Sequence, residues 1–258
     1  MIQWKTLFKK EMLENWRNYK WVWVPLVVIL LAIMDPITTY YLPLIMESVG
    51  GLPDGAVIEM PTPLPRDVIM MSLGQLSSLG VLIIVLMMMG TISGEIKSGV
   101  SELILVKPVT YRNYITSKWA SFLIIVWVSL FVALLTSWYY INLLFGELSF
   151  LSLLQVILFY GLWLTLVVTL TIFYNALVQT PGLVAGLTII TTIAMSIITS
   201  IFDHLLTWSP IKLSEHIQEM LIINEVSIDL IATALVTIGM IAGLLIGAIY
   251  IFRKKEII

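Results

Sequence analysis

Six long apolar runs dominate the pattern of hydrophobic and polar positions along the chain. Their length suits membrane-spanning α-helices, which need about 20 mostly apolar residues to cross the hydrocarbon core of a bilayer. The expected spans cover residues 21–44, 68–90, 119–141, 150–174, 181–202 and 230–252. We therefore predict an all-α integral membrane protein in which residues 21–258 form a single domain of six transmembrane helices.

The first 20 residues have a different pattern, in which aromatic and apolar side chains are mixed with bases. They include Trp4, Leu7, Phe8, Trp16 and Tyr19 among Lys5, Lys9, Lys10, Arg17 and Lys20. This mixture is typical of an amphipathic helix lying on anionic lipid. We expect residues 1–20 to form such an interfacial helix, and a secretory signal is not favoured because no small-residue cleavage site follows.

The distribution of basic residues predicts the orientation in the membrane. All of the 14 lysines and arginines except Arg66 and Lys212 lie before residue 21, between residues 91 and 118, or after residue 252. Because Lys and Arg accumulate in cytoplasmic loops, both termini are expected in the cytoplasm. With only 12% charged and 59% hydrophobic residues, we expect a multi-pass protein of the bacterial cell membrane.

Sequence motifs of enzymes are missing. The chain has no H-E-x-x-H, G-x-S-x-G or Walker A sequence, so we expect neither catalysis nor ATP hydrolysis by this chain itself. It has no cysteine, which excludes disulfides and thiolate metal sites. His204 and His216 match no metal-ligand spacing and are interpreted as solvated interfacial residues. No catalytic, cofactor or metal site is predicted.

The polar stretch of residues 91–118 separates the second and third spans. Leu103–Val106 form a short amphipathic segment that ends before Pro108, since the residue preceding a proline is pushed out of the α region. Thr110 is a suitable N-cap for the helix that enters the third span. A short helix with an apolar face under the membrane is suited to docking against a cytoplasmic partner.

This stretch resembles the pattern between the second and third spans of ABC-2 type permeases, the membrane subunits of ATP-driven exporters. The matching positions are Glu95, Gly99, Glu102, Leu103, Leu105, Pro108, Val109, Thr110, Arg112 and Lys118. The chain departs from the pattern at Tyr111, where a second basic or polar residue is common. The resemblance implies that Glu95, Gly99, Glu102, Leu105, Pro108 and Arg112 couple the chain to an ABC ATPase subunit, which binds the ATP.

The implied function is that of a permease subunit that forms an export path as a homodimer or with a sister permease. Membrane lipid is a further expected partner and nucleic acid is not. Only Asp35 is ionisable well inside a span, so the energy for transport is expected from outside the chain. The alternative function is a non-transporting membrane protein that anchors or regulates a complex.

Two interpretations remain open for the small polar residues inside the spans. Ala185, Thr188, Thr192, Ser196, Thr199 and Asp203 share one helical face, which either lines the path or forms hydrogen bonds between helices. Asp35 either lines the path or caps a break before Pro36. Gly239, Gly243 and Gly247 allow close helix packing, within the chain or across a dimer.

A further helix is expected between the fifth and sixth spans, beginning at Ser209-Pro210 and lying along the outer leaflet. One side carries Leu213, Ile217, Met220 and Leu221, and the other carries Lys212, Glu215, His216 and Glu219. The resemblance implies that this helix closes the outer end of the path.

The orientation can be tested directly, because the chain contains no cysteine. Single cysteines at Asp54 and Glu219 should react with a membrane-impermeant thiol reagent in intact cells, whereas one at Ser101 should not. Labelling at Ser101 from outside would overturn the orientation.

Overall fold

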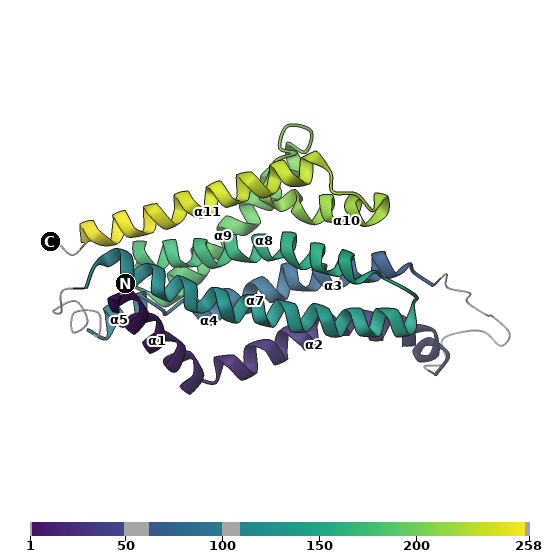
Figure 1. The fold of residues 1–258 in the computed structure, drawn as a ribbon, viewed down its shortest axis with the longest axis horizontal. Helices are drawn as coiled ribbons and strands as arrows, with labels where there is room; N and C mark the ends of the chain where they lie inside the picture. Colours follow the sequence, from purple (N-terminus) through teal and green to yellow (C-terminus); the bar gives the residue numbers. More distant parts are fainter. Residues whose placement is uncertain (1, 49–61, 100–108, 256–258) are drawn as a thin grey trace.

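The computed structural model describes residues 2–48, 62–99 and 109–255, which form an elongated bundle of helices (Figure 1). Its described residues contain no β-strand. The beginning of α1 and the end of α11 lie at the same end of the bundle, here called the terminal end; α10 lies toward the other, the distal end. The expected all-α fold is confirmed.

Six helical segments in the described part of the chain are long and apolar enough to cross a membrane: Lys20–Met46, Pro65–Lys97, Tyr111–Leu144, Phe150–Leu177, Pro181–Ile201 and Ile228–Lys254. The helices are α1 (Ile2–Arg17), α2 (Lys20–Ser48), α3 (Pro65–Gln75), the π-helix η1 (Leu76–Gly80), α4 (Val81–Met88), α5 (Ser93–Lys97), α7 (Tyr111–Leu144), α8 (Phe150–Leu177), α9 (Pro181–Ile201), the 3₁₀ turn η2 (Pro210–Lys212), α10 (Leu213–Ile223) and α11 (Ile228–Lys255).

Helix α8 forms the centre of the bundle. In the most apolar stretch of α8, 78% of the residues are buried, whereas the corresponding share is only 22% in α2, α9 and α11. The contact between α7 and α8 depends on Gly161, because a Cβ there would lie 2.5 Å from the Trp127 ring. The indole of Trp127 donates a hydrogen bond to Thr165, one turn further along α8 (3.1 Å).

The outer helices α2, α9 and α11 present large apolar side chains outward, as expected where the solvent is lipid.

The predicted interruption of the first span at Asp35-Pro36 is wrong, because α2 continues through Pro25, Pro36 and Pro43. A proline removes the hydrogen bond to the carbonyl four residues earlier, which for Pro36 is that of Ala32. The hydroxyl of Ser72, on α3, donates to this carbonyl at 2.8 Å. A neighbouring helix therefore replaces the missing donor, as is common for prolines in membrane helices.

The expected helix between the fifth and sixth spans is present as η2 and α10. Leu213, Ile217, Met220 and Leu221 are buried, as its pattern predicted. The interpretation of His216 as a solvated residue is wrong, because its side chain is more than 90% buried. Lys212, expected on the same side of the helix, is buried as well.

The two buried side chains have partners that the pattern of α10 does not reveal. The His216 ring donates from Nε2 to the Thr207 carbonyl (2.9 Å). Lys212 pairs with Asp203 and with Glu215 (2.5 Å). Hydrogen bonds from the Lys212 ammonium to these two carboxylates raise its pKa. The turn before α10 is thus held by polar contacts.

The predicted N-cap Thr110 is correct in position but not in chemistry, because it precedes α7 and its side chain makes no capping hydrogen bond. Thr180 precedes α9 in the same way, also without a capping hydrogen bond. Pro181 occupies the first turn of α9, where its missing N–H costs nothing. Fixed backbone geometry at Pro181 therefore begins the fifth span without help from the threonine hydroxyl.

Candidate functional site

A buried ion-pair network joins three helices at the terminal end. Its centre is Lys118 of α7, which is 1% exposed. The ammonium group lies 2.9 Å from a carboxylate oxygen of Glu11, on α1, and 2.9 Å from one of Glu95, on α5. A buried ammonium is costly unless it is paired, so this contact fixes α1 and α5 against α7.

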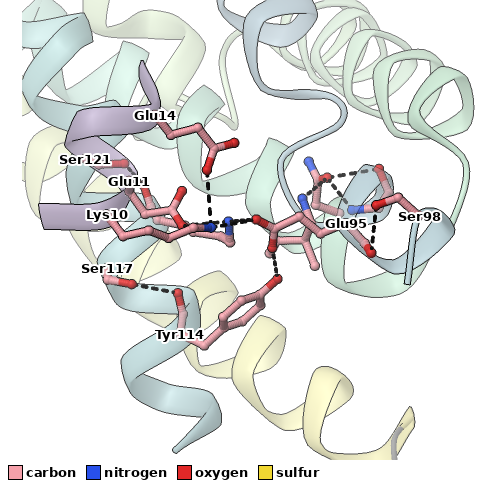
Figure 2. Close-up of polar contacts among 12 residues, drawn as sticks. Lys10, Glu11, Glu14, Glu95, Ser98, Tyr114, Ser117 and Ser121 are labelled. Carbon is pink, nitrogen blue, oxygen red and sulfur yellow. Dashed lines mark hydrogen bonds and ion pairs between the residues drawn. The ribbon is translucent and has the colours of Figure 1, made fainter. Parts of the chain in front are cut away.

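Lys10 adds a second cation to the same carboxylates. Its ammonium lies 3.1 Å from Glu11, 3.2 Å from Glu14 and 3.0 Å from Glu95. Figure 2 shows Lys10 reaching from α1 toward Glu95, while Tyr114 of α7 donates its hydroxyl to the other oxygen of that carboxylate. Burial lowers the pKa of Lys10, but the charges of Glu11 and Glu95 outweigh it and the pKa is raised.

The carboxylates of Glu11, Glu14 and Glu95 lie close enough to hold a metal ion, with one oxygen of each within 4.8 Å of the others. However, the ammonium groups of Lys10 and Lys118 already contact these oxygens. The two lysines thus occupy the positions that a metal ion would take among the three carboxylates. We therefore treat this group as an ion-pair network that positions helices.

Asn175 of α8 holds the segment between α4 and α5. Its buried side-chain oxygen accepts from the backbone N–H of Ile92 (3.1 Å) and of Ser93 (3.2 Å). Its amide nitrogen donates to the carbonyls of Met88 (3.1 Å) and Thr171 (3.0 Å). One side chain thus satisfies backbone groups that the break between α4 and α5 leaves unpaired. The sequence analysis missed this residue, although a lone Asn in an apolar span is a signal for such a role.

The structure describes only some of the residues that are expected to couple the chain to a partner. Glu95 belongs to the buried network, and Gly99 follows α5 with φ of 74°, a conformation that favours glycine. Arg112 is exposed on the first turn of α7. Glu102, Leu105 and Pro108, together with the expected short helix, lie outside the described residues. Lys118, taken as a base of the polar stretch, is a buried anchor.

The polar face of the fifth span divides into two pairs. Thr192 and Ser196 line a cleft of about 460 Å³, together with Met70, Leu73, Gly74, Ser77, Trp163, Ile193, Ile211 and Ser214. Thr188 is buried and bonds to the Val184 carbonyl of its own helix (2.8 Å). Thr199 shares a hydrogen bond with Ser209 (2.7 Å). Neither hydrogen bond joins two spans, so both interpretations of this face stay predictions.

The second span contributes to the cleft through its π-helical turn, η1. A π-turn inside an α-helix is rare and is frequent at functional sites. Ser77, on this turn, lines the cleft and shares a hydrogen bond with the Tyr160 hydroxyl (3.0 Å). Asp35 is not among the lining residues; its carboxylate accepts from the Gln75 amide at 3.3 Å.

The glycines of the sixth span do not act alike. An added Cβ at Gly247 would lie 3.2 Å from the Phe173 ring, so this glycine packs against α8. Added Cβ atoms at Gly239 and Gly243 would meet nothing within 4 Å in the described chain. Of these three glycines, Gly247 is therefore the one that packs closely against the described part of the chain.

These features define a multi-pass, all-α membrane protein. No family model matches the sequence. Over 219 residues the chain is 31% identical to the uncharacterized transmembrane protein YxlG of Bacillus subtilis (strain 168), a match that covers 85% of each chain. The chain belongs to the same family of transmembrane proteins as YxlG.

Replacing the central cation of the network should destabilise the protein strongly. Lys118→Met removes a partner of two largely buried carboxylates, which typically costs about 3–5 kcal/mol. We expect a clear fall in the thermal unfolding midpoint in detergent. Lys9→Met, at an exposed position on α1, is the matched control and should leave the midpoint unchanged.

Adding Glu95→Gln to Lys118→Met should restore part of the lost stability, because it removes one of the stranded charges. Equal midpoints for Lys118→Met and Lys9→Met would show that the network does not hold these helices together.

Proposed function

We propose that this chain is the permease subunit of an ABC exporter, forms the export path as a dimer, and is driven by separate ATPase subunits that dock on residues 91–118. The observation that carries the proposal is the fixation of α5. This short helix leads into the stretch that resembles the ABC-2 pattern, and its Glu95 pairs with Lys118 and Lys10. A segment that receives force from a partner needs such a rigid connection to the spans.

The connection would spread a displacement over the bundle. Lys118 links α5 to α7, Lys10 links it to α1, and Asn175 holds its first residues on α8. Pressure on the segment after Gly99 would therefore move α1, α5 and α7 as one unit. Glu95 would contribute to coupling indirectly, by positioning the segment, whereas the exposed Arg112 could contact the ATPase itself.

The space for a path lies along α9 and the second span. The cleft at Thr192 and Ser196 is one hollow on this seam. A second cavity, of about 430 Å³, lies at the terminal end between α1, the second span and α7, and Pro181 alone borders it from α9. The cleft at Thr192 and Ser196 is therefore the hollow that favours transport over the alternative of a purely anchoring protein.

The proposal includes a dimer and an orientation in the bacterial cell membrane. The weakly buried helices α9 and α11 offer apolar faces to a second permease, and Gly239 and Gly243 lie on one of them. Exposed bases lie along α1 and at the ends of α5, α7 and α11, all at the terminal end: Lys5, Lys9, Arg17, Lys97, Arg112, Arg253 and Lys254. Their position supports cytoplasmic termini. ATP would be bound by the partner subunit.

The ATPase test uses the product of a neighbouring gene that carries a Walker A sequence, co-expressed with this chain. Arg112→Ala and Glu102→Ala should each weaken co-purification about tenfold, or about 1.4 kcal/mol, while leaving membrane insertion and dimerisation intact. Lys5→Ala, an exposed base on α1, is the control. If Arg112→Ala and Glu102→Ala both bind the ATPase and stimulate hydrolysis like the parent, residues 91–118 are not the coupling element.

The path can be probed without knowing the cargo. A cysteine at Thr192, in the cleft, should react with a water-soluble thiol reagent, because the thiolate forms readily only in contact with water. A cysteine at Leu30, 53% exposed near the middle of α2, faces lipid and should stay unmodified. ATP and the ATPase should change the rate at Thr192. A rate at Thr192 as low as at Leu30 would contradict a water-accessible path.

A further inference from the structure

The second half of α1 turns polar side chains toward the bundle and apolar side chains outward, which is the reverse of a surface helix on a water-soluble protein. Glu11 and Asn15 face the bundle and are 4% and 2% exposed, whereas Leu13 and Trp16 are 57% and 63% exposed. Tyr19, in the turn before α2, is 72% exposed. Large apolar and aromatic groups on the outward side indicate contact with lipid, and aromatic residues gather at the level of the headgroups. Helix α1 therefore marks headgroup depth.

The cavity at the terminal end lies at this same level. Glu11, Glu14, Asn15 and Asn18 of the α1 region form one of its walls, and Lys20, Met89, Gly90, Thr91, Phe122 and Pro181 are among its other lining residues. Its volume of about 430 Å³ could hold on the order of ten waters. Leu86, 48% exposed, adds an apolar surface beside it. The cavity thus combines polar walls with an apolar border.

Lys20 is a cation on this wall that lies in the field of Glu14 and Glu11 but makes no direct ion pair with them. In the described residues no carboxylate oxygen lies within 4.0 Å of its ammonium group, whereas Lys10 and Lys118 each contact at least two carboxylates. Its ammonium lies over the Phe122 ring, 4.7 Å from the centroid. This contact leaves the donors of the ammonium free for an oxygen ligand.

A second polar group on the wall also lacks a partner. The Thr91 hydroxyl is buried and has no hydrogen-bond partner in the described chain. Such groups are normally satisfied, and an exception calls for a partner that the protein does not itself supply. Lys20 and Thr91 come from the ends of two different spans that border one cavity.

We propose that this cavity binds the phosphate of one phospholipid headgroup, with Lys20 as the main contact. The phosphate supplies the negative charge and the oxygen acceptors that Lys20 and Thr91 require. The acyl chains leave the cavity past Leu86 into the bilayer. The three carboxylates that line the cavity, those of Glu11, Glu14 and Glu95, each pair with Lys10, and two of them also pair with Lys118. The hydrogen-bond donors of Lys20 therefore remain for the phosphate. This inference does not depend on the export function.

Native mass spectrometry of the purified protein tests the site. Delipidated protein is titrated with phosphatidylglycerol, and the fraction carrying one retained lipid is measured at each concentration. Lys20→Gln should weaken retention about tenfold. Arg17→Gln, an exposed base three residues earlier on α1, should have no effect. Lys20→Arg should retain the lipid, because it keeps the charge and the donors.

The remaining outcomes distinguish a site from a charged surface and a lipid from a free anion. Equal losses for Lys20→Gln and Arg17→Gln would overturn the site in favour of diffuse attraction to the basic end. Displacement of the lipid by millimolar inorganic phosphate would overturn the lipid assignment. An unchanged unfolding midpoint of Lys20→Gln, measured in detergent without lipid, separates loss of binding from loss of fold.

Discussion

The burial of one ammonium group constrains the terminal end of this protein. Lys118 is almost fully enclosed, and a lone buried charge would cost several kcal/mol. Its two carboxylate partners come from α1 and α5, which are far apart in the sequence. Helix α1 can therefore leave this position only by separating Glu11 from Lys118 and Lys10 from Glu95. The same pair of contacts fixes the beginning of the segment between the second and third spans, which a partner would have to move.

The number and approximate limits of the spans were predictable, because the length of an apolar run is a local property of the sequence. The continuity of α2 was not predictable in this way. Pro36 indicates a break by itself, and the compensating hydroxyl of Ser72 comes from another helix. His216 was misplaced for a related reason. Its helical face predicts solvent, but the Thr207 carbonyl, in the turn before α10, gives it a buried partner.

The candidate site, too, was predictable from the sequence only in part. Glu95 was selected by its resemblance to a family pattern, and its position beside the membrane follows from the sequence. The pairing of Glu95 with Lys10 could not be predicted from the sequence. Aromatic and basic residues are mixed along α1, so its pattern does not show which face meets lipid. Apolar side chains usually lie inside a protein, but lipid reverses this rule because it replaces water as the solvent. An amphipathic helix at a membrane can therefore bury its charges in protein and expose its leucines. The burial of Glu11 and Asn15 beside an exposed Trp16 is an instance.

The charges at the terminal end therefore fall into two groups with different physical roles. Charges that find partners within the chain, such as Lys118, resist separation of the helices because each would be left unpaired in a region of low dielectric. Charges without such partners, such as Lys20 and Arg112, keep their electrostatic attraction for groups outside the chain. A lipid phosphate at Lys20 and a protein surface at Arg112 would then act on one rigid unit from two sides. The network between them would connect membrane composition to partner docking, since Arg112 lies on α7, which Lys118 holds against α1, and Lys20 begins α2 shortly after α1 ends.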